Sequence, residues 1–253
     1  MRERIAGIST AQSRLVRSLH RRRERDAARL YLAEGLRLLE ELAPAPRAVR
    51  FLFALEEKVD DLARRFPDTP IAVVRPREFE QLSATEAGQG CGAVVEMPEP
   101  PRFDQVLHAP GPILYLDRLA DPGNLGTILR TADWFGLRTV LLSPGSVDLY
   151  NPKTVRAGMG AHVRLLVRSD ITLEMLVELR RPLIALDADA GERLGAWPIP
   201  SNAIIAVGSE AHGLAPELRE RAKLLAIPQG GGGESLNAAV AAGIVLWEVG
   251  GRA

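Results

Sequence analysis

The sequence predicts an α/β protein whose C-terminal part forms a parallel sheet, preceded by a smaller α/β domain. Apolar runs of four or five residues alternate with helical patterns along the C-terminal half, and these runs are almost continuously hydrophobic. Such strands are typical of a sheet covered on both faces, and a βαβα order favours parallel pairing. The predicted strands are residues 113–116, 139–142, 163–167, 183–186, 203–207 and 224–227.

Two helices flank this predicted sheet at positions that matter for function. Residues 124–134 place Leu125, Ile128 and Leu129 at helical spacing on one buried face, which directs Arg130 away from that face. Residues 236–247 form the second helix, with Ser235 as the expected N-cap and an apolar stripe expected to face inward. That stripe comprises Leu236, Val240, Gly243, Ile244 and Trp247.

The first 97 residues predict a small α/β domain with basic charge at its start. Helices are expected over 9–25 and 34–42, and strands over 49–55, 71–74 and 93–95. The stretch 98–110 is rich in proline and lacks apolar periodicity, which is typical of a linker. The predicted organisation is therefore an N-terminal domain over 1–97, a linker over 98–110 and a C-terminal domain over 111–253.

Positive charge is concentrated at the N-terminus, although the whole chain is neutral, with 32 basic and 32 acidic residues. Residues 1–50 carry 12 arginines against 6 acidic residues, which suits contact with a polyanion but equally suits a solvated helix face. Six of these arginines fall in the predicted helix 9–25. They are Arg14, Arg17, Arg21, Arg22, Arg23 and Arg25.

Cysteine content and hydropathy restrict the remaining classes. Cys91 is the single cysteine, which excludes a disulfide within the chain and a cysteine-rich metal site. The longest apolar stretch, 238–247, is too short to cross a bilayer, and no signal segment is evident. We therefore expect a soluble cytoplasmic protein without a metal.

Three segments combine a strand end, a turn and a helix start. Residues 116–130 bring Asn124 and Arg130 onto a helix after a Pro-Gly turn, although a capped surface helix with a solvated arginine would look the same. Residues 203–214 run a buried strand into Gly208, where bare backbone permits close approach of a ligand, and then to Glu210. Residues 227–237 hold four glycines, but their spacing matches neither common phosphate-binding motif.

In this order, the three segments resemble the sequence motifs of the SpoU/TrmH family in the SPOUT superfamily. The matching strings are NLGTILR, VGSEAHGL and IPQGGGGESLNAAVAAGI. Residues 9–97 are similar to the ribosomal-protein-like RNA-binding domain that precedes many members. The resemblance implies an RNA 2′-O-ribose methyltransferase with a deep trefoil knot, acting as a homodimer on RNA, with ribosomal RNA favoured over transfer RNA.

The resemblance also implies a cofactor, S-adenosylmethionine, and the residues around it. By position in the motifs, Gly208, Ile227 and Leu236 would contact the cofactor largely through backbone atoms. Further expected contacts are Leu186, Pro228, Ser235 and Asn237. The expected catalytic set is Arg130 and Asn124, with Glu210, Ser235 and Asn237 holding its geometry.

Arg130 is expected to position the ribose hydroxyl and stabilise the developing oxyanion, because an arginine is almost always protonated. Deprotonation by Arg130 is the alternative. Three rival functions remain open from the residues: methylation of a guanine nitrogen with Glu210 as the base, RNA binding without catalysis, and a nicotinamide-dependent oxidoreductase. The glycine pattern disfavours the oxidoreductase.

Overall fold

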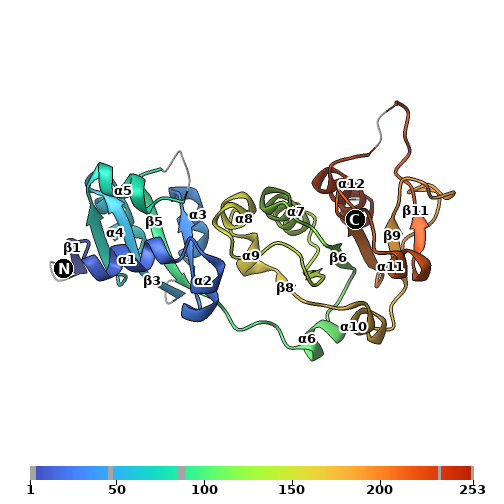
Figure 1. The fold of residues 1–253 in the computed structure, drawn as a ribbon, viewed down its shortest axis with the longest axis horizontal. Coiled ribbons are helices and arrows are strands. Elements are labelled where there is room, and N and C mark those ends of the chain that lie inside the picture. The colour runs from blue at the N-terminus through green and yellow to red at the C-terminus, as the bar shows by residue number, and fades with distance from the viewer. Residues whose placement is uncertain (1–3, 45–47, 85–88, 233–234, 252–253) are drawn as a thin grey trace. The chain divides into compact units, whose positions relative to one another are not determined.

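The computed structural model describes residues 4–44, 48–84, 89–232 and 235–251. The chain divides into two compact units (Figure 1): Met1–Glu99 with Tyr150–Gly160, and Pro100–Leu149 with Ala161–Ala253. The first unit is a mixed α/β domain and the second contains a parallel sheet, so the predicted fold class is confirmed. Gly233 and Glu234 of the third motif lie outside the described residues.

The first unit is a five-stranded sheet in the order β1-β4-β3-β5-β2. Strands β1, β4 and β3 run parallel, and β5 joins β3 and β2 antiparallel. The strands are β1 (Ile5–Gly7), β2 (Leu30–Glu34), β3 (Val49–Leu55), β4 (Ile71–Val74) and β5 (Cys91–Glu96). The helices are α1 (Thr10–Ser18), α2 (Arg22–Ala28), α3 (Leu36–Leu42), α4 (Glu56–Arg65), α5 (Pro76–Leu82) and α8 (Pro152–Gly158).

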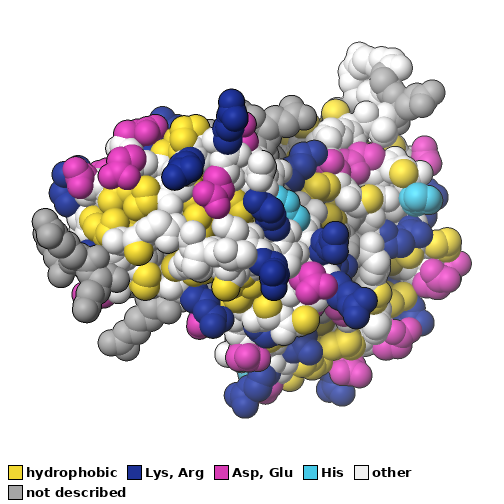
Figure 2. Space-filling model, turned by 60° about the vertical axis from the view of Figure 1, so that its left-hand side comes forward, with side chains coloured by type: hydrophobic (Ala, Val, Ile, Leu, Met, Phe, Trp, Pro, Cys, Tyr) yellow, Lys and Arg dark blue, Asp and Glu magenta, His cyan; other side chains and the backbone are white. Residues whose placement is uncertain are grey.

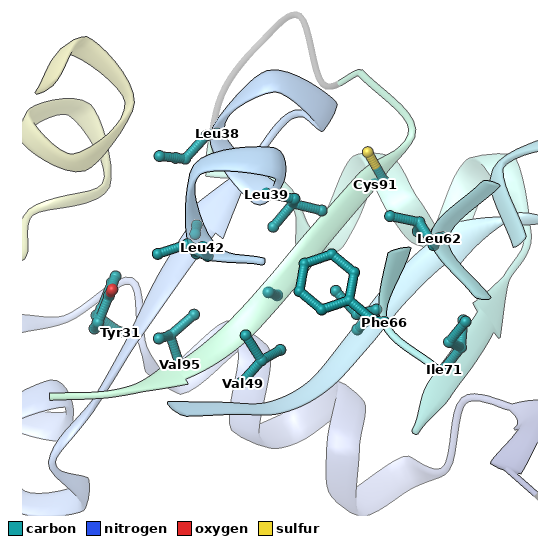
Figure 3. Close-up of a cluster of buried hydrophobic side chains, with 14 of the residues drawn as sticks. Tyr31, Leu38, Leu39, Leu42, Val49, Leu62, Phe66, Ile71, Cys91 and Val95 are labelled. Atoms are coloured by element: carbon teal, nitrogen blue, oxygen red, sulfur yellow. The ribbon is translucent and has the colours of Figure 1, made fainter. Parts of the chain in front are cut away.

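The core of the first unit is aliphatic, with few aromatic side chains. Figure 3 shows Phe66 and Tyr31 among the buried leucines and valines on one face of the sheet. Val155 of α8 also belongs to this cluster, although α8 lies between two strands of the second unit in the sequence. The segment Tyr150–Gly160 therefore completes the core of a unit to which it is distant in sequence.

The predicted helix over 9–25 is wrong, because the chain turns between α1 and α2. Ser9 caps α1 with a complete capping box, and the helix ends at Leu19. Arg25 is only 2% exposed, and its Nη1 donates to the carbonyl oxygens of Leu19 at 2.8 Å and His20 at 3.0 Å. Carbonyl groups at a helix C-terminus lack partners within the helix. Arg25 therefore stabilises the end of α1, and our assignment of Arg25 to RNA contact is corrected.

The second unit is a six-stranded, fully parallel sheet in the order β11-β9-β10-β6-β7-β8. Helices α6, α10 and α11 contribute to the cluster on one face, while α7 packs against α9 and α12, and α12 also contacts β10. The strands are β6 (Ile113–Asp117), β7 (Thr139–Leu142), β8 (Leu166–Arg168), β9 (Leu183–Leu186), β10 (Ile204–Gly208) and β11 (Lys223–Leu225). The helices are α6 (Phe103–Leu107), α7 (Pro122–Trp134), α9 (Ala161–Arg164), α10 (Leu173–Glu178), α11 (Pro216–Arg221) and α12 (Ala238–Gly250).

The stretch expected to be a linker over 98–110 contains α6. Val106 of this helix is fully buried in the core of the second unit. Arg181 also donates to the carbonyl oxygens of Leu107, Ala109 and Gly111, which fixes the segment after α6. The boundary between the units falls between Glu99 and Pro100, so much of the stretch 98–110 is ordered structure.

The apolar stripe of α12 does not face inward, and that expectation is wrong. Leu236, Val240 and Trp247 are about half-exposed, whereas the neighbouring face of α12 carries the buried residues. The N-cap is Asn237, whose Oδ1 accepts from the backbone N–H groups of Ala239 and Val240. Small alanines allow α12 to lie close to the sheet and to α7, which leaves the larger side chains outside. The trefoil knot stays a prediction.

No helix in the described ranges is long and apolar enough to cross a membrane.

Candidate active site

The site forms where parallel strands end at the same edge of the second sheet. Strand β10 pairs with β6 so that Gly208 lies opposite Asp117 at their carboxyl ends, and β9 ends nearby at Leu186. Ligands of open parallel sheets collect beyond this edge. The turn before α7, the loop after β10 and the start of α12 all leave this edge, which explains why the three motifs meet.

Three polar side chains, one from each motif, form a hydrogen-bond network. Asn124 donates through Nδ2 to Glu210 Oε1, and Asn237 donates through Nδ2 to Asn124 Oδ1 at 3.1 Å. The backbone N–H of Ala238 donates to the same Glu210 oxygen at 3.1 Å. The network thus links α7, the loop after β10 and the first residue of α12.

The local structure of α7 frees Asn124 for this role. Asp121 is the N-cap, and its side chain accepts from the backbone N–H of Asn124 at 2.8 Å. Asn124 therefore lies in the first turn and does not cap the helix, so its amide can bond to Glu210. Arg130 lies six residues further along α7, a rise of about 9 Å, and its side chain is exposed.

Asp117 supports the loop that carries Glu210. Its carboxylate is 3% exposed and accepts from the backbone N–H of Ala215 at 2.6 Å. This bond ties the end of the 209–215 loop to the end of β6. The sequence analysis missed Asp117, although a carboxylate at the end of a buried apolar run was a usable signal.

A cavity of about 580 Å³ opens beside the network. Its volume falls within the range of roughly 300–1,000 Å³ that is typical of small-molecule sites. Six of the seven residues expected around the cofactor line it, and Glu210 lines it too. The six are Leu186, Gly208, Ile227, Pro228, Ser235 and Leu236.

The remaining expected site residues lie outside the cavity wall. Asn237 and Asn124 belong to the network, and Arg130 is on the exposed face of α7. Ser235 lines the cavity but makes no hydrogen bond to another described residue, so it does not join the network. The wall also includes Asp187, Asp189 and Arg219, which sequence reasoning missed.

Gly208 is required by the backbone around it. A Cβ at this position would lie 2.4 Å from the carbonyl carbon of Gly213 and 2.7 Å from the backbone nitrogen of Leu214. Those atoms cannot move without displacing the loop that carries Glu210. Backbone from Gly208 and Gly213, with apolar side chains such as Val207 and Ile227, forms a surface suited to a flat nucleoside base.

Arginines at the N-terminus form a separate candidate surface on the first unit. The side chains of Arg14, Arg21 and Arg23 are exposed and have no ion pair with any described residue. Arg17 donates to Gln81 at 2.8 Å and Arg22 lies 3.6 Å from Asp26. On the face shown in Figure 2, acidic side chains lie among the basic ones, so this view shows no uniformly positive surface.

Metal ligation finds no support within the described ranges, where no group of three or more His, Cys, Asp or Glu residues could hold an ion. Burial lowers the pKa of His162 to about 4, with the charge of Arg164 contributing. His162 is thus neutral at physiological pH, and it lies in the core and not at the site.

The geometry defines an α/β protein with a small-molecule cavity beside a polar network at the carboxyl edge of a parallel sheet. Comparison with known proteins identifies the family. Residues 111–247 match the SpoU rRNA Methylase family, and the chain belongs to it. Residues 12–93 match the MRM3-like substrate binding domain.

Relatives resemble the chain over nearly its full length. The 23S rRNA (guanosine(2553)-2′-O)-methyltransferase RlmP of Bacillus subtilis is 32% identical over 96% of this chain and 98% of its own. A TrmH-family structure from Porphyromonas gingivalis superposes with a TM-score of 0.84 at 32% identity, covering 97% of this chain and 99% of that one. The SpoU methyltransferase AviRb of Streptomyces viridochromogenes, in complex with the cofactor AdoMet (S-adenosylmethionine), gives a TM-score of 0.84 at 26% identity, covering 96% and 98%.

Proposed function

We propose that this protein transfers a methyl group from S-adenosylmethionine to a ribose 2′-hydroxyl of ribosomal RNA. The observation that carries the proposal is that Glu210 belongs both to the network and to the wall of the cavity. A group that touches both can couple the cofactor to the acceptor site. Support also comes from the activity named for the B. subtilis relative and from the cofactor bound in AviRb.

The cavity residues fit the cofactor. Bare backbone at Gly208 and apolar side chains such as Ile227 and Leu236 would hold the adenosine part. When bound, the cofactor supplies a methyl group on a positively charged sulfur, which needs no metal to activate it. The carboxylate of Glu210 lies on the same wall and favours a positive charge there.

Arg130 acts on the ribose. Its guanidinium stays protonated and presents several donors in a planar fork, so it orients the ribose and its phosphate and stabilises the oxyanion that develops at the 2′-oxygen. Asn124 orients the acceptor from the same helix. Glu210 and Asn237 hold the Asn124 amide in place.

The protein acts as a homodimer in which each site combines two copies. Arg130 does not line the cavity of its own chain. Its helix face also carries Trp134, which is 83% exposed, and the exposed stripe of α12 adds Val240 and Trp247. Apolar surface of this kind is typical of a protein interface. We assign these residues to a face that pairs with a second copy and brings Arg130 to the partner's cavity.

The substrate RNA binds through the exposed arginines of α1 and α2, together with the C-terminal unit. Those arginines can neutralise phosphates without sequence preference, which leaves choice of the nucleotide to the catalytic unit. We assign the protein to the cytoplasm, where bacterial ribosomal RNA is made.

Single-turnover methylation tests the role of Arg130. With RNA and cofactor saturating, Arg130→Ala should lower the rate by on the order of 10²–10⁴, because it removes a positioned oxyanion-stabilising group. Arg130→Lys should not restore the rate, since an ammonium lacks the planar fork. Arg138→Ala is the matched control, because Arg138 is an exposed arginine just after α7. An Arg130→Ala rate close to the parental rate would refute the assigned site.

Product analysis separates the rival functions. A ribose 2′-O-methyl group blocks alkaline cleavage of the adjacent phosphodiester, whereas a methylated guanine nitrogen leaves that bond cleavable. Resistance at one position is expected in RNA treated with the protein and cofactor. A methylated but fully cleavable RNA would favour base methylation by Glu210, and an unmethylated RNA that still binds would favour a binding protein.

A further inference from the structure

A cluster of charged side chains lies on the wall of the cofactor cavity and has no part in the proposed methyl transfer. Asp187 and Asp189 follow β9 directly, and Arg219 projects from α11. Among the described residues that line the cavity, Arg219 alone carries a guanidinium or ammonium group. The described hydrogen bonds of Glu210 go to Asn124, Asn237 and Ala238 and not to this cluster.

The geometry of the cluster leaves specific atoms available. Arg219 binds Asp187 through two atoms, with Nε at 2.8 Å from Oδ2 and Nη2 at 3.0 Å from Oδ1. The Asp187 side chain is 11% exposed, and its Oδ1 also accepts from the backbone N–H of Asp189 at 2.9 Å, so both of its oxygens have partners. Arg219 Nη1 has no hydrogen-bond partner among the described residues. Arg219 Nη2 also lies 3.6 Å from Asp189 Oδ2, and the Asp189 side chain is 85% exposed.

The chemistry of the ligand supplies a match for this pair. S-adenosylmethionine has an adenosine part, which suits the apolar and backbone wall, and an aminobutyrate part that carries one carboxylate and one ammonium group. A fixed guanidinium beside a solvent-exposed carboxylate is complementary to that zwitterion. Ion pairs with a pre-organised arginine also lose less side-chain entropy, because Asp187 already holds the fork.

We propose that Arg219 and Asp189 recognise the amino-acid end of the cofactor, with Arg219 Nη1 donating to the carboxylate and Asp189 accepting from the ammonium group. Asp187 is a positioning residue that fixes the guanidinium. This inference rests on the proposed function, because it takes S-adenosylmethionine as the ligand of the cavity.

Calorimetry with two thioethers tests the assignment without measuring methyl transfer. S-adenosylhomocysteine carries the aminobutyrate, whereas 5′-methylthioadenosine lacks it but keeps the adenosine. Arg219→Gln should weaken S-adenosylhomocysteine binding by roughly tenfold or more, the loss expected for a charged hydrogen bond, and change methylthioadenosine binding by less than about twofold. Asp189→Asn should act in the same direction with a smaller effect. Arg221→Gln is the control, since Arg221 is exposed on α11 and does not line the cavity.

Comparison of the two thioethers separates loss of the contact with the amino-acid end from general damage to the cavity. An Arg219→Gln variant that loses affinity for both thioethers equally would show a general disturbance of the cavity and overturn the inference. Unchanged binding of S-adenosylhomocysteine would overturn it as well. A parent protein that binds neither thioether would refute the cofactor site itself, and the role of Arg219 with it.

Discussion

Replacing Trp134 by glutamate is expected to separate the two copies of the proposed dimer. Trp134 is 83% exposed on the same face of α7 as Arg130. A tryptophan side chain buries up to about 250 Å², so roughly 200 Å² remains for a partner to cover, worth up to about 5 kcal/mol per copy at ~25 cal/mol/Å². The substitution removes that burial and places a carboxylate in the interface. Because about 1.4 kcal/mol corresponds to a tenfold change in an equilibrium constant, the dimer dissociation constant should rise by three orders of magnitude or more.

Sedimentation equilibrium over a range of protein concentrations measures this change. Val177→Glu is the control, because Val177 is an exposed apolar residue on α10, a helix that contributes to the core on the other face of the sheet. Trp134 makes no contact that its own fold depends on, so the thermal stability of the monomer should hold. A Trp134→Glu protein that stays dimeric at low micromolar concentration would refute the assignment of this face.

Mixing two inactive variants tests whether the site is shared between copies. Arg130→Ala removes the arginine. Gly208→Ala weakens cofactor binding, and the assay uses a cofactor concentration that leaves the cavity of this variant largely empty. In a mixed dimer with shared sites, one site keeps both an intact arginine and an intact cavity, so random mixing should restore about one quarter of the parental activity. No recovery in verified mixed dimers would place Arg130 and the cavity of one chain in the same site.

Three further outcomes follow from the described geometry. Exchange of Arg14, Arg21 and Arg23 for glutamine should weaken RNA binding and lower the salt dependence of the binding constant by roughly 0.7–0.9 for each phosphate that is no longer neutralised. A salt titration of RNA binding measures this slope. An unchanged slope would show that the RNA binds another surface. Gly208→Ala should weaken S-adenosylhomocysteine binding about tenfold or more in calorimetry, because its Cβ would meet Gly213 at 2.4 Å, and full affinity would contradict that clash. Because burial lowers the pKa of His162 from 6.5 to about 4, the folded state disfavours the protonated form. Its stabilising contribution is therefore complete above pH 6.5 and is lost as the pH falls toward 4, by up to about 3 kcal/mol. Urea unfolding of His162→Gln should show a correspondingly smaller loss of stability in acid, and equal losses would refute the buried neutral histidine.

Strands buried on both faces were predictable from the sequence. The bounds expected for β3, β4, β7 and β9 agree with the structure, because short and nearly unbroken apolar runs mark a strand covered on both sides. Shorter elements carried no such signal. Strand β1 has three residues, and the apolar run over 163–167 divides between α9 and β8, since a run of that length does not distinguish helix from strand.

The candidate site was predictable where the backbone alone dictates a residue. Gly208 stands where no Cβ fits, and Glu210 follows the same strand end. The N-cap of α12 was not predictable, because Ser235 and Asn237 are both good N-cap residues. Only the path of the preceding loop selects Asn237. An apolar stripe in a sequence also does not distinguish a helix face that packs inside its own chain from one that is left exposed. For this reason the exposed face of α12 was expected to be buried.

Asn237 ties the stability of the protein to its chemistry. Its Oδ1 caps α12, while its Nδ2 bonds to Asn124 and lies 3.4 Å from Glu210 Oε1. Aspartate would keep the cap but lose the donor, and it would set a second negative charge against Glu210. Serine would keep the cap on a shorter side chain that lacks the amide N–H group. Glutamine would keep the amide on a longer arm that no longer suits the cap. A substitution of Asn237 that alters the cap of α12 therefore also alters the hydrogen-bond network of the candidate site.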